Sequence, residues 1–321
     1  MKFHLQFPIP PFTEKLNYRQ TFLSIGSCFA ENIGELMQNN LFNITINPNG
    51  IVYNPASIAI ALRRHYSGTN FIESDLFLAN DLWNSWEHHS VFSQPDKEST
   101  LNALNQSVKN AHNTLLNAEW LMITFGSAYY YQLNDTGKIV ANCHKQKQQI
   151  FTKHLLTVND IVDDYQQLIQ QLHSINPNLK IVFSISPVRY KRDGVMENTR
   201  SKARLIEAVH SLVETNNATF YFPAYELVLD DLRDYRFFKE DLVHPNQVAI
   251  NYVFDKWKET IFNEETKGLF ERIKSLVADC NHRPLHASTA SQQEFITATR
   301  LRAAKLKEEF PFLPIEQLLP L

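Results

Sequence analysis

Glycine and cysteine are both scarce in this sequence. It has eight glycines among 321 residues, so each glycine is a candidate for a backbone conformation that other residues disfavour. The three cysteines, Cys28, Cys143 and Cys280, are an odd number without metal-ligand spacing, which argues against a disulfide framework and a zinc site. The glycine fingerprints of phosphate loops and dinucleotide-binding folds are absent. We therefore expect neither a metal nor a nucleotide cofactor.

A strong net charge and long apolar runs are also lacking. The net charge is −3, which predicts no basic surface for nucleic acid. No apolar run approaches the roughly 20 residues that a membrane span requires. Prolines and charges interrupt residues 1–16, where a secretory signal needs an apolar core. We therefore expect a cytoplasmic protein with no membrane span.

Short apolar runs alternate with helical patterns along most of the chain. The runs cover residues 20–26, 42–46, 120–126, 180–186 and 218–222. Helical spacing is found over residues 29–40, 55–65, 104–115, 161–172 and 199–216. We expect Pro245 to open a further helix, and we expect residues 66–97 to be irregular. This alternation predicts a three-layer α/β fold with a doubly wound, parallel, five-stranded sheet in the flavodoxin-like order 2-1-3-4-5. Its ligand site is expected at the carboxyl ends of strands 1 and 3.

The last part of the chain has a different pattern. Helical spacing continues over residues 264–280 and 291–309, and no further strand-like run follows. We therefore divide the chain into an α/β domain over residues 1–262 and a helical extension over residues 263–321. The extension is expected to pack on the core or to form a homodimer contact.

The stretch SIGSCFAENIG, residues 24–34, places two candidate nucleophiles where a strand passes into a helix. A thiol at a helix N-terminus lies at the positive end of the helix dipole, so we expect Cys28 to have a lowered pKa and to attack. Ser27 would then cap the helix. Two alternatives stay open: Ser27 attacks while Cys28 packs in the core, or neither residue takes part in chemistry.

A second informative stretch, FFKEDLVHPNQVAINY, covers residues 237–252. Asp241 and His244 are three residues apart in a polar turn before Pro245. A carboxylate at this spacing can orient the imidazole and stabilise its protonated form, leaving the other ring nitrogen to act as a base. Together with Cys28 or Ser27, this pair predicts a catalytic triad.

These two motifs resemble the GDSL/SGNH hydrolases, which are esterases and acyl-hydrolases on a flavodoxin-like sheet. The segment GSCFAENIG is similar, more closely, to the GSCFA family. Further similarity to this family lies in NPNGIVYNPASI, ANCHK, SPVRY and DDLRDYRFFKEDLVHP. The resemblance covers roughly residues 3–260.

The resemblance implies roles for three strand-end segments. Aligning the glycine of the superfamily's Gly-Asp-Ser pattern places Cys28 on the nucleophile. Gly50 matches the loop glycine of the oxyanion hole, although a plain turn glycine is an equal alternative. The third segment, which begins at Gly126, lacks the expected asparagine, and Ser127 or Asn54 is a candidate replacement donor.

Other polar and aromatic residues have both functional and structural interpretations. His144 is a candidate for substrate binding, catalysis or zinc, but a loop role fits its lone position better. Arg189 is a candidate for binding a carboxylate or phosphate, or for an ordinary ion pair. Trp83 and Trp86 can line a sugar pocket, but an aromatic lid or small core is the favoured interpretation.

The sequence therefore predicts an SGNH-like hydrolase or acyltransferase acting on a small-molecule or glycan acyl ester, with a carbohydrate ester as one option. A non-catalytic binding or scaffold protein is the rival hypothesis, supported by the missing asparagine. Thiol redox chemistry at Cys28 is a third alternative, but no resolving cysteine is close in sequence.

Overall fold

The computed structural model describes residues 4–282 and 289–318. Its centre is a parallel sheet with the strand order β10-β9-β5-β1-β2. The five strands are β1 (Thr21–Gly26), β2 (Asn43–Ile46), β5 (Trp120–Phe125), β9 (Lys180–Ile185) and β10 (Thr219–Phe222). Numbered within the sheet alone, this is the order 2-1-3-4-5, so the predicted flavodoxin-like topology is confirmed.

Every residue of β5 is buried, because both faces of the sheet are covered. Trp120 and Met122 point into one hydrophobic cluster, whereas Leu121 and Ile123 point into the other. This alternation follows from the two-residue period of a strand. The fully apolar run therefore encodes a central strand between two helical layers.

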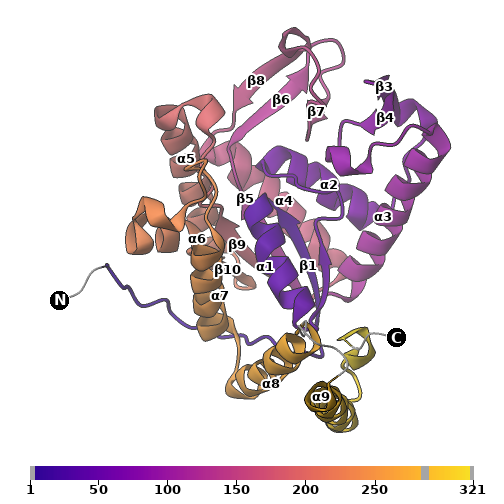
Figure 1. The fold of residues 1–321 in the computed structure, drawn as a ribbon. Coiled ribbons are helices and arrows are strands. Elements are labelled where there is room, and N and C mark those ends of the chain that lie inside the picture. Colours follow the sequence, from indigo (N-terminus) through magenta and orange to yellow (C-terminus); the bar gives the residue numbers. More distant parts are fainter. Residues whose placement is uncertain (1–3, 283–288, 319–321) are drawn as a thin grey trace.

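Helices flank the sheet on both sides (Figure 1). One face is covered by α1 (Cys28–Asn39) and α7 (Gln247–Ile261), which lie side by side. The other face is covered by α2 (Pro55–Ser67), α4 (Val158–Ile175), α5 (Val195–Thr215) and the end of α3 (Lys97–Asn117). Beyond β10, the short α6 (Ala224–Glu226) continues into a π-helix, η5 (Leu227–Leu232).

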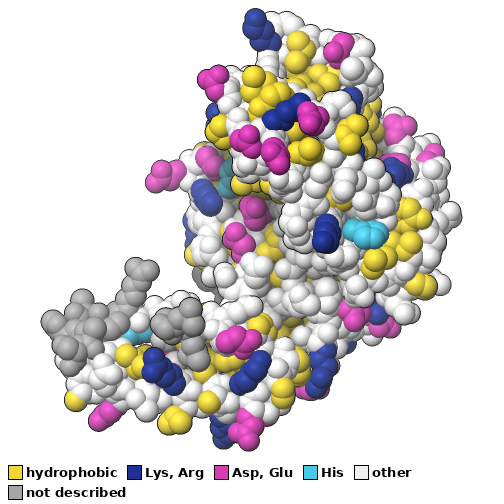
Figure 2. All heavy atoms as spheres, turned by 90° about the vertical axis from the view of Figure 1, so that its right-hand side faces the viewer, with side chains coloured by type: hydrophobic (Ala, Val, Ile, Leu, Met, Phe, Trp, Pro, Cys, Tyr) yellow, Lys and Arg dark blue, Asp and Glu magenta, His cyan; other side chains and the backbone are white. Residues whose placement is uncertain are grey.

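The C-terminal extension consists of α8 (Glu264–Cys280), α9 (Ala290–Glu309) and the 3₁₀ turn η7 (Ile315–Leu318). Leu276 of α8 and Leu306 of α9 belong to the same hydrophobic cluster as α1 and α7. Figure 2 shows these helices projecting sideways from the base of the α/β body. Within residues 4–282 and 289–318, no helix combines the length and apolar character of a membrane span.

Two antiparallel excursions were not predicted. The segment expected to be irregular contains the hairpin of β3 (Leu76–Ala79) and β4 (Leu82–Ser85), so that expectation is wrong there. A second small sheet joins β6 (Tyr129–Leu133), β7 (Ile139–Val140) and β8 (Phe151–Leu155). Five 3₁₀ turns complete the described elements: η1 (Glu73–Asp75), η2 (Ser90–Phe92), η3 (Gln148–Ile150), η4 (Lys191–Asp193) and η6 (Tyr235–Phe237).

The two tryptophans of the first excursion form part of small aromatic cores. Trp86 stacks on Phe77 with 3.7 Å between ring centroids and meets Phe151 edge to face. Trp83 packs against a separate cluster that includes Phe71. The aromatic-core interpretation of these residues therefore fits the structure, and the second excursion is tied to the first through Trp86.

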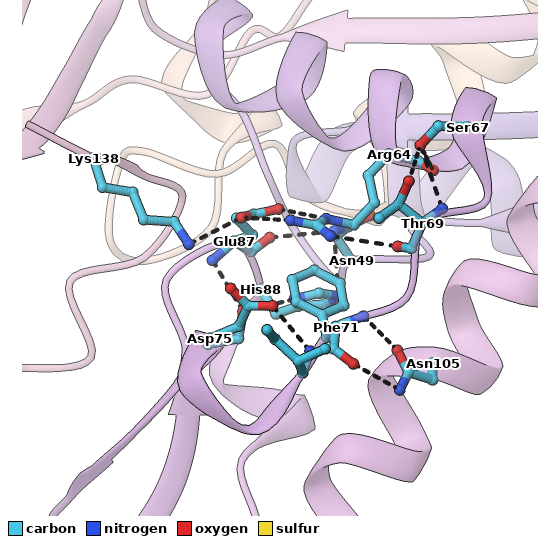
Figure 3. Close-up of polar contacts among 12 residues, drawn as sticks. Asn49, Arg64, Ser67, Thr69, Phe71, Asp75, Glu87, His88, Asn105 and Lys138 are labelled. Atoms are coloured by element: carbon cyan, nitrogen blue, oxygen red, sulfur yellow. Dashed lines mark hydrogen bonds and ion pairs between the residues drawn. The ribbon is translucent and has the colours of Figure 1, made fainter.

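A buried polar network fastens the first excursion to α2 (Figure 3). The guanidinium of Arg64 donates to both carboxylate oxygens of Glu87, at 2.9 and 3.1 Å. Lys138 lies 3.1 Å from the same carboxylate, and Asn49 Nδ2 donates to the Glu87 carbonyl oxygen at 3.2 Å. Because Glu87 is nearly fully buried, these partners are needed to offset the loss of its hydration.

Candidate functional site

The junction of β1 and α1 requires a glycine. Gly26 has φ +151°, and a Cβ atom at this position would lie 2.3 Å from the carbonyl oxygen of Thr124. The backbone N–H of Gly26 donates to Asn47 Oδ1 at 2.9 Å, which ties the loop after β2 to this junction. The strand can therefore turn directly into α1 with β5 packed closely against it.

Ser27 and Cys28 have different surroundings. Ser27 is fully buried, and its Oγ accepts a hydrogen bond from the N–H of Phe29 at 3.2 Å, so the predicted capping role is confirmed. Cys28 is the first residue of α1 and is half-buried, and its side chain packs at the margin of the core. Of the two candidate nucleophiles, Cys28 is the one with a partly accessible side chain.

The environment of Cys28 raises the pKa of its thiol, so the expected lowering is wrong. Burial is the main cause, and the carboxylate of Glu31 on the same helix adds to it. The backbone N–H of Cys28 and the ammonium groups of Lys239 and Lys202 act in the opposite direction. Desolvation of the thiolate therefore outweighs the favourable helix terminus.

Asp241 and His244 form the predicted pair. His244 Nδ1 lies 2.6 Å from Asp241 Oδ2, and Asp241 Oδ1 accepts the backbone N–H groups of Val243 and His244 at 2.9 and 3.0 Å. These hydrogen bonds hold the pKa of the Asp241 carboxyl far below its usual range. Within the described part of the chain, His244 Nε2 has no hydrogen-bond partner. The ring is thus oriented, with one nitrogen available as a base.

Arg189, which follows β9, holds this turn in place. Its backbone N–H donates to the Val243 carbonyl oxygen at 3.4 Å, and its Nη1 donates to the Leu242 carbonyl oxygen at 3.3 Å. Its guanidinium also lies 4.4 Å from the ring centroid of Phe238. No carboxylate pairs with Arg189 in residues 4–282 and 289–318, so the ordinary ion pair is not what this side chain forms.

Pro245 lies outside α7 rather than in its first turn. The helix begins at Gln247, and Asn246 caps it by accepting the N–H of Ala249 at 3.1 Å. Pro245 instead forms an isolated β-bridge with Phe238, which closes the Asp241–His244 turn. The expected helix start is therefore wrong by two residues, because the asparagine is a better cap.

The turn and Cys28 face the same edge of the sheet. Arg189 anchors the turn beyond the carboxyl end of β9, and Cys28 follows the carboxyl end of β1. Lys239, whose backbone N–H donates to the His244 carbonyl oxygen at 2.7 Å, is close enough to lower the pKa of the Cys28 thiol. The described contacts include no hydrogen bond between His244 and Cys28 or Ser27.

The segment after β5 turns its serine away from this edge. Ser127 is buried, and its Oγ lies 3.2 Å from Ser201 Oγ of α5 and accepts the N–H of Tyr129 at 3.1 Å. Gly126 donates its N–H to the Tyr53 carbonyl oxygen at 2.7 Å. A Cβ on Gly126 would lie 2.4 Å from Tyr190 Oη, so this glycine makes room for a tyrosine.

Gly50, Asn54 and His144 all have structural contacts. Gly50 has φ +69° and donates its N–H to the Asn47 carbonyl oxygen at 2.7 Å, which is the turn role considered for it. Asn54 caps α2 by accepting the N–H of Ser57 at 2.8 Å. His144 Nε2 donates to the Ser85 carbonyl oxygen at 2.8 Å, and its Nδ1 lies 3.3 Å from Ser90 Oγ.

One further residue at this edge was missed in the sequence. Lys202 of α5 is 1% exposed, and its Nζ donates to the carbonyl oxygens of Gly126 and Ser186, both at 2.6 Å. Burial lowers the pKa of Lys202 to about 7. The sequence did carry a signal for its burial. Lys202 lies three residues before Leu205, so helical spacing places it on the same buried face of the helix.

A groove of about 420 Å³ adjoins the Asp241–His244 turn. Its walls come from the loop after β9, from α5, from α6 and η5, and from the turn itself. The apolar and aromatic lining residues are Tyr190, Val195, Tyr225, Leu229, Tyr235, Leu242 and Val243. Among the described residues, no group of three or more His, Cys, Asp or Glu side chains is arranged to hold a metal.

Comparison with known proteins supports a family assignment. No curated protein matches the chain. A family 3 carbohydrate esterase from Clostridium thermocellum is a structural match with a TM-score of 0.35 and 10% identity, covering 80% of this chain and 98% of the other. A family model described as the GSCFA domain protein, C-terminal domain, matches residues 273–319. The model of the GSCFA family matches residues 21–257. This second match includes the strands β1 to β10, Cys28 and the Asp241–His244 turn. The chain therefore belongs to the GSCFA family.

Proposed function

We propose that this protein is an acyl-ester hydrolase or acyltransferase in which Cys28 is the nucleophile and His244 the general base. One observation carries the proposal: His244 is oriented by Asp241 through a 2.6 Å hydrogen bond, with its Nε2 unpaired among the described residues, at the same sheet edge as Cys28. Nucleophilic acyl transfer requires an oriented imidazole within reach of a thiol, and the shared sheet edge is what supports this pairing of His244 with Cys28. The resemblance of both motifs to the SGNH hydrolases supports the same chemistry.

The reaction proceeds in two half-reactions. His244 Nε2 takes the thiol proton while Cys28 Sγ bonds to the acyl carbon, and the carbonyl electrons move to oxygen. The tetrahedral intermediate then expels the alcohol, which receives the proton from His244, and a thioester remains on Cys28. Water, deprotonated by His244, releases the acid and restores the thiol. An acceptor alcohol in place of water gives acyl transfer.

The start of α1 supplies a donor for the oxyanion. The N–H of Cys28 lies in the first turn of α1, where no carbonyl oxygen of the helix accepts it, and it contacts the thiol of its own residue. Such a group is well suited to stabilise a developing negative charge. Asn54 stays a prediction as a second donor, because its side-chain nitrogen has no partner among the described residues. Gly50 also stays a prediction as a substrate contact, but its N–H is engaged in a turn.

The groove beside the turn suits the apolar part of a substrate. Leu242 and Val243, which precede His244 in the chain, line it together with three tyrosines. Its volume of about 420 Å³ lies within the range of small-molecule sites. The substrate class we propose is therefore a small-molecule or glycan acyl ester whose apolar part lies along this groove.

The test combines covalent labelling with ester turnover. Iodoacetamide and a fluorophosphonate are applied at neutral pH to the wild type and to Ser27→Ala, Cys28→Ala, Cys28→Ser and His244→Ala. The same proteins are assayed with p-nitrophenyl esters of increasing chain length. We expect modification at Cys28, lost in Cys28→Ala and strongly reduced in His244→Ala, with turnover falling at least about 100-fold in both.

The non-catalytic binding hypothesis is favoured by the missing asparagine after β5 and by the raised pKa of the half-buried Cys28 thiol. It predicts equal labelling of the wild type and His244→Ala, and no turnover of any ester in the panel. That result would overturn the hydrolase proposal. A substrate preference that changes in Leu242→Glu, with Cys28 labelling retained, would support the groove as the acyl site.

A further inference from the structure

Lys202 is a buried lysine without a carboxylate partner among the described residues. Its side chain is 1% exposed, and no Asp or Glu forms an ion pair with it in residues 4–282 and 289–318. Two of its three N–H donors are used by the carbonyl oxygens of Gly126 and Ser186. Burying a charge without a counter-ion costs several kcal/mol, so a lysine in this position needs a reason.

The position of Lys202 supplies such a reason. Gly126 follows β5 and Ser186 follows β9, so the ammonium lies at the carboxyl edge of the sheet. Cys28 follows β1, the neighbour of β5, and the thiol and the ammonium each act on the ionisation of the other. Cys28 is therefore a group at this edge on which a negative charge can form within electrostatic reach of Lys202.

Apart from the proposed base His244, the titratable and charged groups that interact with Cys28 come from four elements. Glu31 on α1 opposes a negative charge there, and desolvation raises the pKa of the Tyr190 phenol after β9, so this phenol stays neutral. Lys239, in the turn, and Lys202, on α5, favour the charge. Lys239 is exposed, so water and salt screen it, whereas Lys202 acts through the protein interior.

At the carboxyl edge of the sheet, Ser127 after β5 is not directed toward Cys28 as a side-chain donor, because its hydroxyl is hydrogen-bonded to the hydroxyl of Ser201 on α5. From these placements we infer that Lys202 is the buried cation that stabilises negative charge at Cys28, first on the thiolate and then on the oxyanion formed by its attack. The inferred stabilisation of the thiolate depends only on where Lys202 lies. The inferred stabilisation of the oxyanion also rests on the proposed function. The third N–H of the ammonium is the donor available for this role.

The thiolate part is tested without any ester. The rate of Cys28 alkylation by iodoacetamide is measured from pH 6 to 10, by mass spectrometry of the Cys28 peptide, for the wild type, Lys202→Met, Lys202→Arg and Lys239→Met. We expect Lys202→Met to alkylate about tenfold more slowly at pH 7, Lys202→Arg to stay within about threefold of the wild type, and Lys239→Met to change little. Identical profiles for the wild type and Lys202→Met would overturn the inference.

A reciprocal measurement covers the case in which Lys202→Met does not fold. The ammonium of Lys202 is titrated by NMR with labelled lysine, in the wild type and in Cys28→Ala. We expect the midpoint to fall in Cys28→Ala, because the thiolate no longer favours the ammonium, and an unchanged midpoint would contradict the inference. If the thiol profiles behave as expected but no ester is turned over, the hydrolase proposal fails while the role of Lys202 in thiolate formation stands.

Discussion

Asp241 Oδ2 lies 2.6 Å from Nδ1 of His244, three residues later in the same turn. The other carboxylate oxygen accepts two backbone N–H groups of that turn, so the carboxylate is fixed before it meets the imidazole. This pair needs no contact from another element to orient the ring. The first prediction follows from it.

Asp241→Asn is expected to keep the turn but to lose the imidazole orientation. The amide oxygen can still accept the two backbone N–H groups, whereas the amide nitrogen cannot accept the Nδ1 proton. We expect kcat/KM for a p-nitrophenyl ester to fall at least about 100-fold, with Tm nearly unchanged.

Asp234→Asn is the matched control, because Asp234 also accepts a backbone N–H in this loop and has an exposed ion pair with Arg236. We expect this control to retain activity within about threefold. Equal losses in both variants would show that the effect is a general one of charge in the loop.

Ser27→Ala is expected to lower stability while leaving the nucleophile in place. The variant removes the Oγ that accepts the Phe29 N–H at the start of α1. Loss of such a cap costs about 1 kcal/mol in the free energy of unfolding, measurable by urea denaturation. Alkylation of Cys28 should persist. If stability is unchanged and ester turnover disappears, Ser27 and not Cys28 is the attacking residue.

Gly26→Ala is expected to destabilise the fold by more than about 3 kcal/mol. The backbone conformation, at φ +151°, is strained for alanine, and the new Cβ would lie 2.3 Å from the Thr124 carbonyl oxygen. Gly268→Ala in α8 is the matched control, because a Cβ there meets no atom within 4 Å. The control should gain about 0.5–1 kcal/mol of helix stability. Similar Tm values for the two variants would refute this account of the β1–α1 junction.

Acidification is expected to destabilise the protein through two buried histidines. Burial lowers the pKa of His65 and of His88 to about 3. Between pH 6.5 and 3 the unfolded chain therefore binds more protons than the folded one at these sites, so stability falls as the pH falls. Each histidine contributes up to about 1.4 kcal/mol per pH unit in this window.

Thermal unfolding measured from pH 7 to pH 5 checks this prediction. The non-titrating variants His65→Gln and His88→Gln should each flatten the dependence of Tm on pH. His282→Gln, at an exposed position, is the control and should not. A wild type whose Tm is constant over this range would contradict the assignment of both buried histidines.

The sheet was predictable because its strands are short, mostly apolar runs between amphipathic helices. The run 120–126 encodes β5 and the run 180–186 encodes β9, since strands covered on both faces need apolar residues throughout. The antiparallel strands β4 and β6 were not predicted, because β4 ends in the buried polar residues Asn84 and Ser85 and β6 carries partly buried tyrosines, so neither is an apolar run. Such strands depend on tertiary contacts, such as the stacking of Trp86 on Phe77.

The candidate site was predictable only in part. Sequence spacing was sufficient for the Asp241–His244 pair, whose members share one turn. The pKa of Cys28 depends on burial by distant segments, so the local expectation from the helix dipole was wrong. The position of Lys202 against Gly126 and Ser186 depends on how α5 lies over the strand ends, and single-sequence spacing does not encode it.

The order of the strands has a consequence for biosynthesis. Cys28 precedes Lys202 and His244 in the chain, and these two residues follow only after most of the α/β body has been translated. The neighbour of β1 on one side, β5, is itself encoded far downstream. A nascent chain therefore carries the Cys28 thiol through most of the synthesis of the α/β body before the two groups that we propose to act on it have been made.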